Sequence, residues 1–232
     1  AVWCSCPAMI LLDLLTTERY GFGTHISESS LDLFSFVAAS RYANEQVDDL
    51  RGGLEARFSC NVNIQGTAEA YTLINELAGV MRAFPIWETG SITLTQDRPT
   101  DPSYLFSLAN VGEGGFSYSG SSLKQRHSII SVSYFNMDSQ EIDYEVVGDN
   151  VTQPDFLQED VDRQAKLGII KKDIKAFACT SRGQARRLGK AVLLSEESES
   201  EVVTFTTSIE SGAVVRPGNV IAINDPVKHG QR

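Results

Sequence analysis

The sequence predicts an α+β fold in two parts: an N-terminal helical α+β domain over residues 1–102, then an antiparallel β-barrel-like domain with one packed helix over residues 103–232. Three observations support this prediction. Apolar residues recur at helical spacing through much of the first part. A stretch rich in glycine and proline, residues 97–120, indicates a linker or long loop. Beyond it, segments that alternate polar and apolar residues prevail, as is typical of strands.

Two helices are predicted in the first fifty residues. Pro7 suits the first position of a helix, and MILLDLLTTERY continues it until Gly21 and Gly23. Ser29, with Asp32 three residues later, resembles a helix-capping signal. The apolar residues that recur at near-helical spacing in this region are Leu31, Phe34, Ala38 and Tyr42. We expect them to form the buried face of the second helix.

A strand, a third helix and a hairpin are predicted next. Residues 57–64 (RFSCNVNI) alternate in part and indicate a short strand. Thr67 is suited to cap a helix whose apolar face repeats every three or four residues. That face consists of Ala70, Ile74, Leu77, Met81 and Phe84. Pro85 ends the helix, and residues 85–96 (PIWETGSITLTQ) then predict a β-hairpin with a glycine-containing turn.

Two alternating segments predict an antiparallel strand pair in the second part. Residues 128–135 (SIISVSYF) alternate apolar side chains with serines. Residues 141–147 (EIDYEVV) alternate apolar and acidic side chains, and the apolar ones are Ile142, Tyr144 and Val146. We expect one buried face and one solvated face, with these three residues on the buried face.

The strongest local pattern lies in the last quarter of the chain. Ser181 followed by Gln184 is a capping box, in which each side chain satisfies the other residue's backbone N–H. A helix over about residues 181–197 follows, and its buried stripe is Ala185, Leu188 and Val192. Residues 202–209 and 220–224 predict two strands around the tight turn at residues 216–219 (RPGN). A helix that returns between antiparallel strands favours a small β-barrel or a split sheet.

The charges on this helix are placed against its dipole. Arginines occupy its N-terminal half, and glutamates occupy its C-terminal end. At an exposed site each such misplaced charge lowers the stability of the helix by about 0.3–1 kcal/mol. Two interpretations stay open. Solvent and salt screen the unfavourable interaction with the dipole, or cations spaced i, i+4, i+8 pair with acids of another subunit. The candidate subunit-interface residues are therefore Arg182, Arg186, Arg187, Lys190, Glu196 and Glu197.

The overall charge limits the kind of partner. A net charge of −10 argues against a general nucleic-acid binder, which needs a basic face. Nine of the 30 acids lie between Asp138 and Asp162, and nine of the 20 bases lie between Arg163 and Lys190. These two stretches form either two solvated faces or complementary surfaces that register neighbouring subunits.

The sequence offers no catalytic or metal-binding pattern, so we expect no catalytic residue, no metal and no cofactor. Its three histidines lack helical ligand spacing, and the HExxH, phosphate-loop and G-x-S-x-G motifs do not occur. The four cysteines are expected to be reduced and mostly buried. Because acids are plentiful, a glycosidase-type carboxylate pair remains an open alternative.

Nothing in the sequence indicates direct membrane insertion. The apolar run of residues 8–15 is too short to cross a bilayer, and no basic signal-peptide start precedes it. The sequence begins Ala-Val-Trp without an initiator methionine, from which we expect an excised segment of a longer polypeptide.

Four blocks, in order, resemble the central region of the tail-tip, or host-specificity, protein J family of lambda-like long-tailed bacteriophages. The blocks are LLDLLTTERYGFG (Leu11–Gly23), the segment Gly52–Trp87 with ITLTQDRP (Ile92–Pro99), FSYSGSSLKQRHSIISVSY (Phe116–Tyr134), and AFACTSRGQARRLG (Ala176–Gly189) with the later RPGNVIAI turn. Together they span nearly the whole chain, and the CTSRGQA and QDRP blocks are the more specific ones.

This resemblance implies a structural role. It implies β-barrel domains with α+β insertions, assembled as a homotrimeric hub that caps the tail tube, contacts other tail-tip proteins and links to the receptor-binding fibre. It also implies a location in the virion tail tip after synthesis in the host cytoplasm. No catalytic residues carry over, so an enzyme is not implied. Two alternatives from other classes remain: a tail-associated cell-wall hydrolase, and a carbohydrate- or receptor-binding module.

Overall fold

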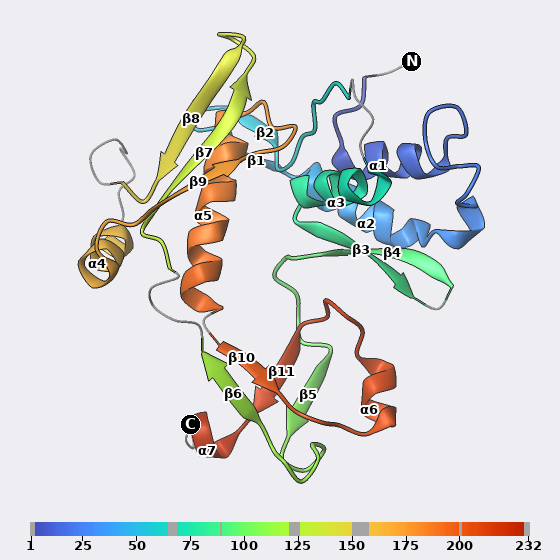
Figure 1. Cartoon of the computed structure of the whole chain (residues 1–232), viewed down its shortest axis with the longest axis vertical. Helices are drawn as coiled ribbons and strands as arrows, with labels where there is room; N and C mark the ends of the chain where they lie inside the picture. The colour runs from blue at the N-terminus through green and yellow to red at the C-terminus, as the bar shows by residue number, and fades with distance from the viewer. Residues whose placement is uncertain are drawn as a thin grey trace.

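The computed structural model describes residues 3–64, 69–88, 90–120, 126–149, 158–199 and 201–229. These residues form three lobes (Figure 1). The helical lobe comprises the described residues up to 102, the sheet lobe those from 126 to 199, and the C-terminal lobe residues 103–120 together with 201–229. The sheet lobe is thus inserted between the two halves of the C-terminal lobe.

The helical lobe packs three helices against a β-hairpin. Its elements are α1 (Pro7–Thr16), the 3-10 turn η1 (Glu28–Ser30), α2 (Leu33–Ala43), β1 (Gln46–Asp48), β2 (Leu54–Ala56), α3 (Ala70–Val80), β3 (Ala83–Glu88) and β4 (Ser91–Gln96). Pro7 opens α1, as predicted. Leu11, Phe36, Leu77 and Met81 are fully buried in its core. The predicted hairpin is confirmed, with β3 and β4 antiparallel.

The buried face of α2 differs from the predicted one. The Asp32 carboxylate accepts the Phe34 N–H at 3.2 Å and caps the helix. Phe34 itself is 88% exposed, and the buried residues of α2 are Phe36, Ala39 and Ala43. Leu31, which precedes the helix, is buried as predicted. The prediction was wrong for α2 itself because apolar residues occupy several faces of this helix, so that spacing alone does not select one.

Two boundaries in the helical lobe also differ from prediction. The third helix ends at Val80, and Arg82 adopts a left-handed φ of 54°, which turns the chain so that Phe84 lies in β3. The predicted cap, Thr67, lies outside the described residues. The strand expected over residues 57–64 is not formed, because the N–H groups of Phe58, Cys60 and Asn61 bind three separate backbone segments.

The sheet lobe consists of a three-stranded sheet with one long helix across it. Its elements are β7 (Ile129–Asn136), β8 (Glu141–Val147), α4 (Gln158–Leu167), β9 (Lys171–Lys175) and α5 (Arg182–Ser198). The strand order is β8-β7-β9, with β8 antiparallel and β9 parallel to β7. The predicted strand pair and the predicted helix are both confirmed, and α5 packs along one face of the sheet (Figure 1).

The two faces of β8 are the reverse of the prediction. The register pairs Val132 with Glu145 and Ile130 with Val147, which places Glu145 and Val147 on the buried side under α5. Ile142 and Tyr144 therefore point away from α5 and are 64% and 63% exposed. The alternation was detected correctly, but a buried glutamate contradicts the rule that the apolar set faces inward.

The C-terminal lobe contains two short sheets and not a closed barrel, as far as the described residues extend. Its elements are β5 (Tyr104–Ser107), β6 (Ser117–Gly120), β10 (Glu201–Thr204), α6 (Ile209–Val214), β11 (Ile221–Asn224) and α7 (Pro226–His229). β11 pairs with β5 in parallel, and β10 pairs with β6 antiparallel. The strand predicted over 202–209 stops at Thr204, and Ser208 caps α6.

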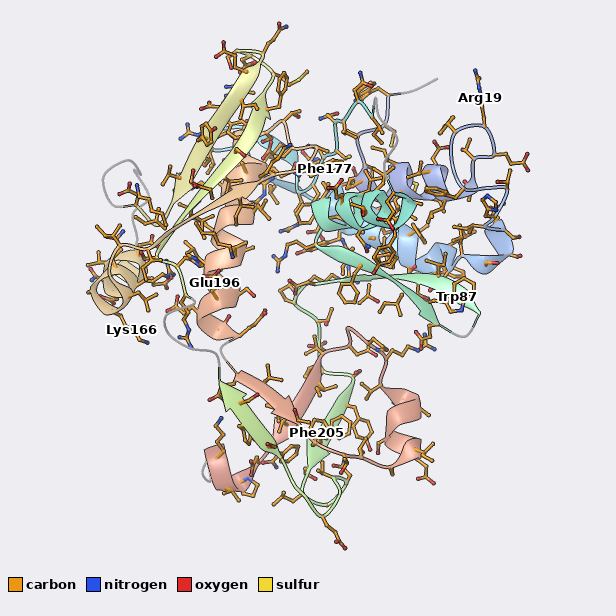
Figure 2. The ribbon with its side chains drawn as sticks, in the orientation of Figure 1. Arg19, Trp87, Lys166, Phe177, Glu196 and Phe205 are labelled. Atoms are coloured by element: carbon orange, nitrogen blue, oxygen red, sulfur yellow. The ribbon has the colours of Figure 1, made fainter. Side chains whose placement is uncertain are left out.

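Aromatic side chains fill the small core of this lobe. The rings of Phe106 and Phe205 lie 4.8 Å apart, and Phe116 meets Phe205 edge-on at 5.3 Å. Figure 2 labels Phe205 between the strands of this lobe. The predicted turn at residues 216–219 is confirmed by the Asn219 N–H donating to the Arg216 carbonyl at 3.0 Å and by a φ of 83° at Gly218.

Candidate subunit interface

The N-terminus of α5 joins the sheet lobe to the helical lobe. The Ser181 Oγ accepts the Gln184 N–H at 3.3 Å, which is one half of the predicted capping box. The other half is replaced by a contact between lobes. The Gln184 Oε1 accepts the N–H and Oγ–H of Ser59 at 3.0 and 2.9 Å, and its Nε2 donates to the Ser59 carbonyl at 3.1 Å.

Further polar contacts extend this junction. The Asn61 side chain donates to the Thr180 Oγ1 at 2.9 Å. Arg187 lies 2.8 Å from the Glu55 carboxylate and donates to the Arg57 carbonyl at 3.0 Å. We call this set of contacts the interlobe seam, and its residues are Glu55, Ser59, Asn61, Thr180, Ser181, Gln184 and Arg187. Gln184 is buried and the other seam residues are half-buried, so these hydrogen bonds are expected to hold the two lobes in one orientation.

The other two arginines of α5 bind a buried glutamate of the sheet. Glu145 lies 2.8 Å from Arg182 and 3.4 Å from Arg186. The Glu145 and Arg186 side chains are both buried, whereas Arg182 is partly in water. A buried carboxylate requires such partners, because removing an unpaired charge from water is very unfavourable.

The glutamates at the other end of α5 also have partners within the chain. Glu196 accepts the His127 N–H at 2.8 Å and lies 3.0 Å from both the His127 Nδ1 and the Lys172 Nζ. Burial alone would raise the pKa of Glu196, but these donors together hold the pKa below its ordinary value. Glu197 lies 2.9 Å from Arg163, which is buried and also binds Asp160 at 2.6 Å. Figure 2 labels Glu196 on the lower half of α5.

These pairs explain why the charges of α5 oppose its dipole. A dipole interaction contributes a few tenths of a kcal/mol to about 1 kcal/mol, and a partly buried, hydrogen-bonded ion pair outweighs it. Lys190 is half-buried, and no ion pair to it is found within the described residues. Whether these six residues also contact another subunit stays a prediction.

A second candidate surface was missed by the sequence interpretation. An apolar groove of about 1050 Å³ lies along the outer face of the β7–β8 hairpin. Its exposed apolar side chains are Trp3, Val62, Phe135, Met137, Ile142 and Tyr144. Phe135 and Ile142 are direct cross-strand partners. The signal in the sequence was that both faces of this hairpin carry apolar residues, so that burying one face leaves the other exposed.

The groove continues to the junction between the lobes. Phe177 and Ala178 follow β9, line the groove, and pack against the core of the helical lobe. Figure 2 labels Phe177 between these two lobes. The Ala178 carbonyl accepts the Asn61 N–H at 2.9 Å, which fixes one wall of the groove.

One cavity brings three of the described carboxylates together. Asp49, Glu55 and Asp138 share a cavity of about 210 Å³. However, Asp138 binds Arg51 at 3.0 Å, and the N–H groups of Arg51 and Gly53 lower the pKa of Asp49. The lowered pKa of Asp49 favours its charged form, whereas a glycosidase requires one carboxyl group that stays protonated.

The described residues include three buried thiols, and they lack both a metal-binding cluster and a membrane-spanning helix. Burial raises the pKa of the Cys60 and Cys179 thiols to about 11, which keeps them protonated and unreactive. Among the described side chains, no cluster of three or more His, Cys, Asp or Glu residues is placed to hold a metal ion. Nor does any helix in this part of the chain have the length and apolar character needed to cross a membrane.

Comparison with known proteins connects the chain to bacteriophage tails. A family model described as "Putative phage tail protein" (Phage-tail_3) matches residues 69–232. Tip attachment protein J of Escherichia phage SECphi27 is 33% identical over 223 residues, which cover 96% of this chain and 18% of that protein. The protein of the same name from Escherichia phage SECphi4 is 29% identical over 224 residues, covering 96% of this chain and 19% of that protein.

The chain therefore spans less than a fifth of the length of these curated relatives. Among solved structures, a tail protein from Neisseria meningitidis MC58 is loosely similar, with 12% sequence identity and a TM-score of 0.48 over 77% of this chain and 51% of that chain. The family model covers more than two thirds of the residues, from α3 to the C-terminal lobe. The chain belongs to the Phage-tail_3 family of phage tail proteins.

Proposed function

We propose that this chain is a non-enzymatic structural segment of the tail tip of a bacteriophage or prophage, and that it forms part of a homotrimeric hub. The observation that carries the proposal is the similarity to two tip attachment proteins, which covers 96% of the chain and therefore all three lobes. A match of this extent supports a shared architecture and not a single shared motif.

The geometry supports a scaffold. Glu55, Ser59 and Asn61 of the helical lobe are bound to the start of α5, so that the two lobes present their surfaces in a fixed relation. The partners that we propose are the tail tube, other tail-tip proteins and the receptor-binding fibre, in the virion, without nucleic acid.

We also propose two finer points of architecture. Residues 1–102 and 103–232 are the two domains, the second with the sheet lobe inserted into it. In the assembled hub, neighbouring strands complete a barrel around the C-terminal lobe. The reason is that its described sheets have two strands each, and two-stranded sheets are marginally stable by themselves.

Cryo-electron microscopy of the intact particle tests the proposal. We expect three copies of this segment around the tail axis, next to the end of the tail tube, with the C-terminal lobe inside a continuous sheet. A position away from the axis, or a copy number that is not a multiple of three, would overturn the hub assignment.

One observation favours a second candidate function. The rings of Trp3 and Tyr144 are 83% and 63% exposed and line the same groove. Exposed aromatic rings are also what a carbohydrate-binding module offers to a sugar face. Binding of the chain to host cell-wall polysaccharide, lost on changing both rings to alanine, would support that alternative. The lack of such binding would exclude it.

A further inference from the structure

The three-stranded sheet has one edge that lacks the usual protection against other strands. Within the described residues, β8 has a partner strand only on its β7 side (Figure 1). Natural proteins protect such edges with devices such as lysine, proline and bulges. The opposite edge strand, β9, carries three lysines in five residues. β8 has neither lysine nor proline, pairs with β7 in unbroken register, and exposes the side chains of Ile142 and Tyr144.

Hydrogen bonds of the central strand show which backbone groups of β8 face this edge. The Ser133 carbonyl accepts the Ala176 N–H at 2.9 Å, and the Phe135 N–H donates at 3.1 Å to a carbonyl in the segment after β9. The backbone groups of these two β7 residues therefore point away from β8. Their cross-strand partners are Tyr144 and Ile142. Because such partners are not hydrogen-bonded to each other, the N–H and C=O groups of Ile142 and Tyr144 face the free edge.

One of these outward N–H groups is already bound by a side chain of the same strand. The Asp143 Oδ1 accepts the Tyr144 N–H at 2.8 Å. The Asp143 Oδ2 accepts the Tyr134 hydroxyl at 3.2 Å and the Asn136 side-chain N–H at 3.3 Å. Two side chains of β7 thus hold the carboxylate in place. The Tyr144 N–H, followed by Asn136, keeps the pKa of Asp143 below its ordinary value, so the carboxylate is charged near neutral pH.

This arrangement obstructs strand pairing in two ways. An incoming strand needs the Tyr144 N–H as a donor, so the bond from that group to Asp143 must break first. The incoming strand would also displace water from a carboxylate, which is unfavourable unless a new partner replaces that water. The obstruction lies at the two exposed apolar side chains of the edge, Ile142 and Tyr144, which would otherwise favour pairing with an apolar strand.

We infer that Asp143 prevents the free edge of β8 from pairing with another strand. Its hydrogen bond to the Tyr144 N–H is the obstacle, and Tyr134 and Asn136 are positioning residues that hold the carboxylate. The hairpin can then keep an apolar outer face without edge-to-edge association. The inference concerns the sheet lobe alone and does not depend on the proposed hub.

Substitution of Asp143 tests this inference. Asp143→Ala removes the acceptor, and we expect copies of this variant to associate through β8. The readout is hydrogen exchange of the Ile142 amide, followed by nuclear magnetic resonance. In the variant this exchange should slow by about tenfold or more when the protein is concentrated, since pairing protects the amide. In the unmodified chain it should not depend on concentration. The matched control, Asp101→Ala, removes the same charge at an exposed site outside the sheet lobe and should behave as the unmodified chain does.

Two further variants separate the hydrogen bond from the charge. Asp143→Asn loses the charge but keeps an oxygen that can accept the Tyr144 N–H, so its Ile142 amide should exchange as in the unmodified chain. Asp143→Val removes the acceptor with a residue that favours strands, and it replaces the alanine variant if circular dichroism shows that the latter unfolds. Exchange independent of concentration in the folded alanine or valine variant would overturn the inference. So would association of Asp143→Asn or Asp101→Ala to the same extent, because the effect would then be one of charge.

Discussion

The close approach of α5 to its sheet gives the sharpest stability prediction. A Cβ atom added at Gly189 would lie 2.7 Å from the Val147 Cγ2 and 3.2 Å from the Val132 Cγ2. Carbon atoms in contact prefer separations of about 3.5–4.0 Å, so Gly189→Ala overpacks this site by several tenths of an ångström or more. We expect that overpacking to cost about 1–3 kcal/mol.

A second glycine provides the control. Gly79 lies in α3, and a Cβ atom added there meets no atom within 4 Å. Both substitutions gain the same helix propensity, about 1 kcal/mol. Gly79→Ala should therefore stabilise its helix by about 0.5–1 kcal/mol. The change in stability caused by Gly189→Ala should therefore be about 1–3 kcal/mol less favourable than that caused by Gly79→Ala, because only the site at Gly189 is overpacked.

Native-state hydrogen exchange is the appropriate assay, since it reports the stability of α3 and α5 separately. A double-mutant cycle then tests the cause. Val147→Ala removes the methyl groups nearest to the new Cβ atom, so it should be less harmful in the Gly189→Ala background than alone. If Gly189→Ala slows exchange in α5 as much as Gly79→Ala does in α3, the close approach of helix and sheet is refuted.

Three further predictions concern the charged, polar and thiol groups. The pKa of Glu196 is lowered in the folded chain, so its contribution to stability is present above the ordinary carboxyl pKa and is lost as the pH falls through the folded value. The stability gap between the unmodified chain and Glu196→Gln in urea titrations should thus be widest near neutral pH and shrink in acid, and a constant gap would refute this. Gln184→Ala removes three hydrogen bonds to Ser59. It should therefore lower the free energy of local opening by about 1–3 kcal/mol, measured by hydrogen exchange of residues 58–61. Unchanged exchange would show that these bonds do not hold the seam. Finally, Cys4 is exposed, so a thiol reagent should label one cysteine per native chain and four in denaturant, and native labelling of a second cysteine would contradict the burial of Cys6, Cys60 and Cys179.

Local patterns predicted the elements whose signals lie within a few residues. Pro7 at the start of α1, Ser181 at the start of α5 and the glycine turn of the β3–β4 hairpin all act on their immediate neighbours. The alternation in β7 also predicted its buried face, since Ile130 and Val132 face α5. Such features depend on backbone geometry that each short segment fixes by itself.

The rest depends on partners that are distant in the sequence. Glu145 is buried because Arg182 and Arg186 approach it from another element, and this reverses the predicted face of β8. Gln184 completes no capping box, because Ser59 offers it a better set of donors and acceptors. The same long-range pairs engage Arg182, Arg186, Arg187, Glu196 and Glu197 of α5 within the chain. A contact of these residues with another subunit stays a prediction.

The insertion of the sheet lobe has a consequence for how such chains diversify. Gly120, at the end of β6, is paired directly with Glu201, at the start of β10. The inserted lobe thus departs from and returns to neighbouring positions on one two-stranded ribbon. A recombination event that replaced everything between those positions would exchange an entire folded unit without moving either strand of the ribbon. The interlobe seam, the packing of Phe177 and Ala178 on the helical lobe and the Arg51–Asp138 ion pair would then have to be matched, so this lobe is exchangeable as a unit wherever those contacts are kept.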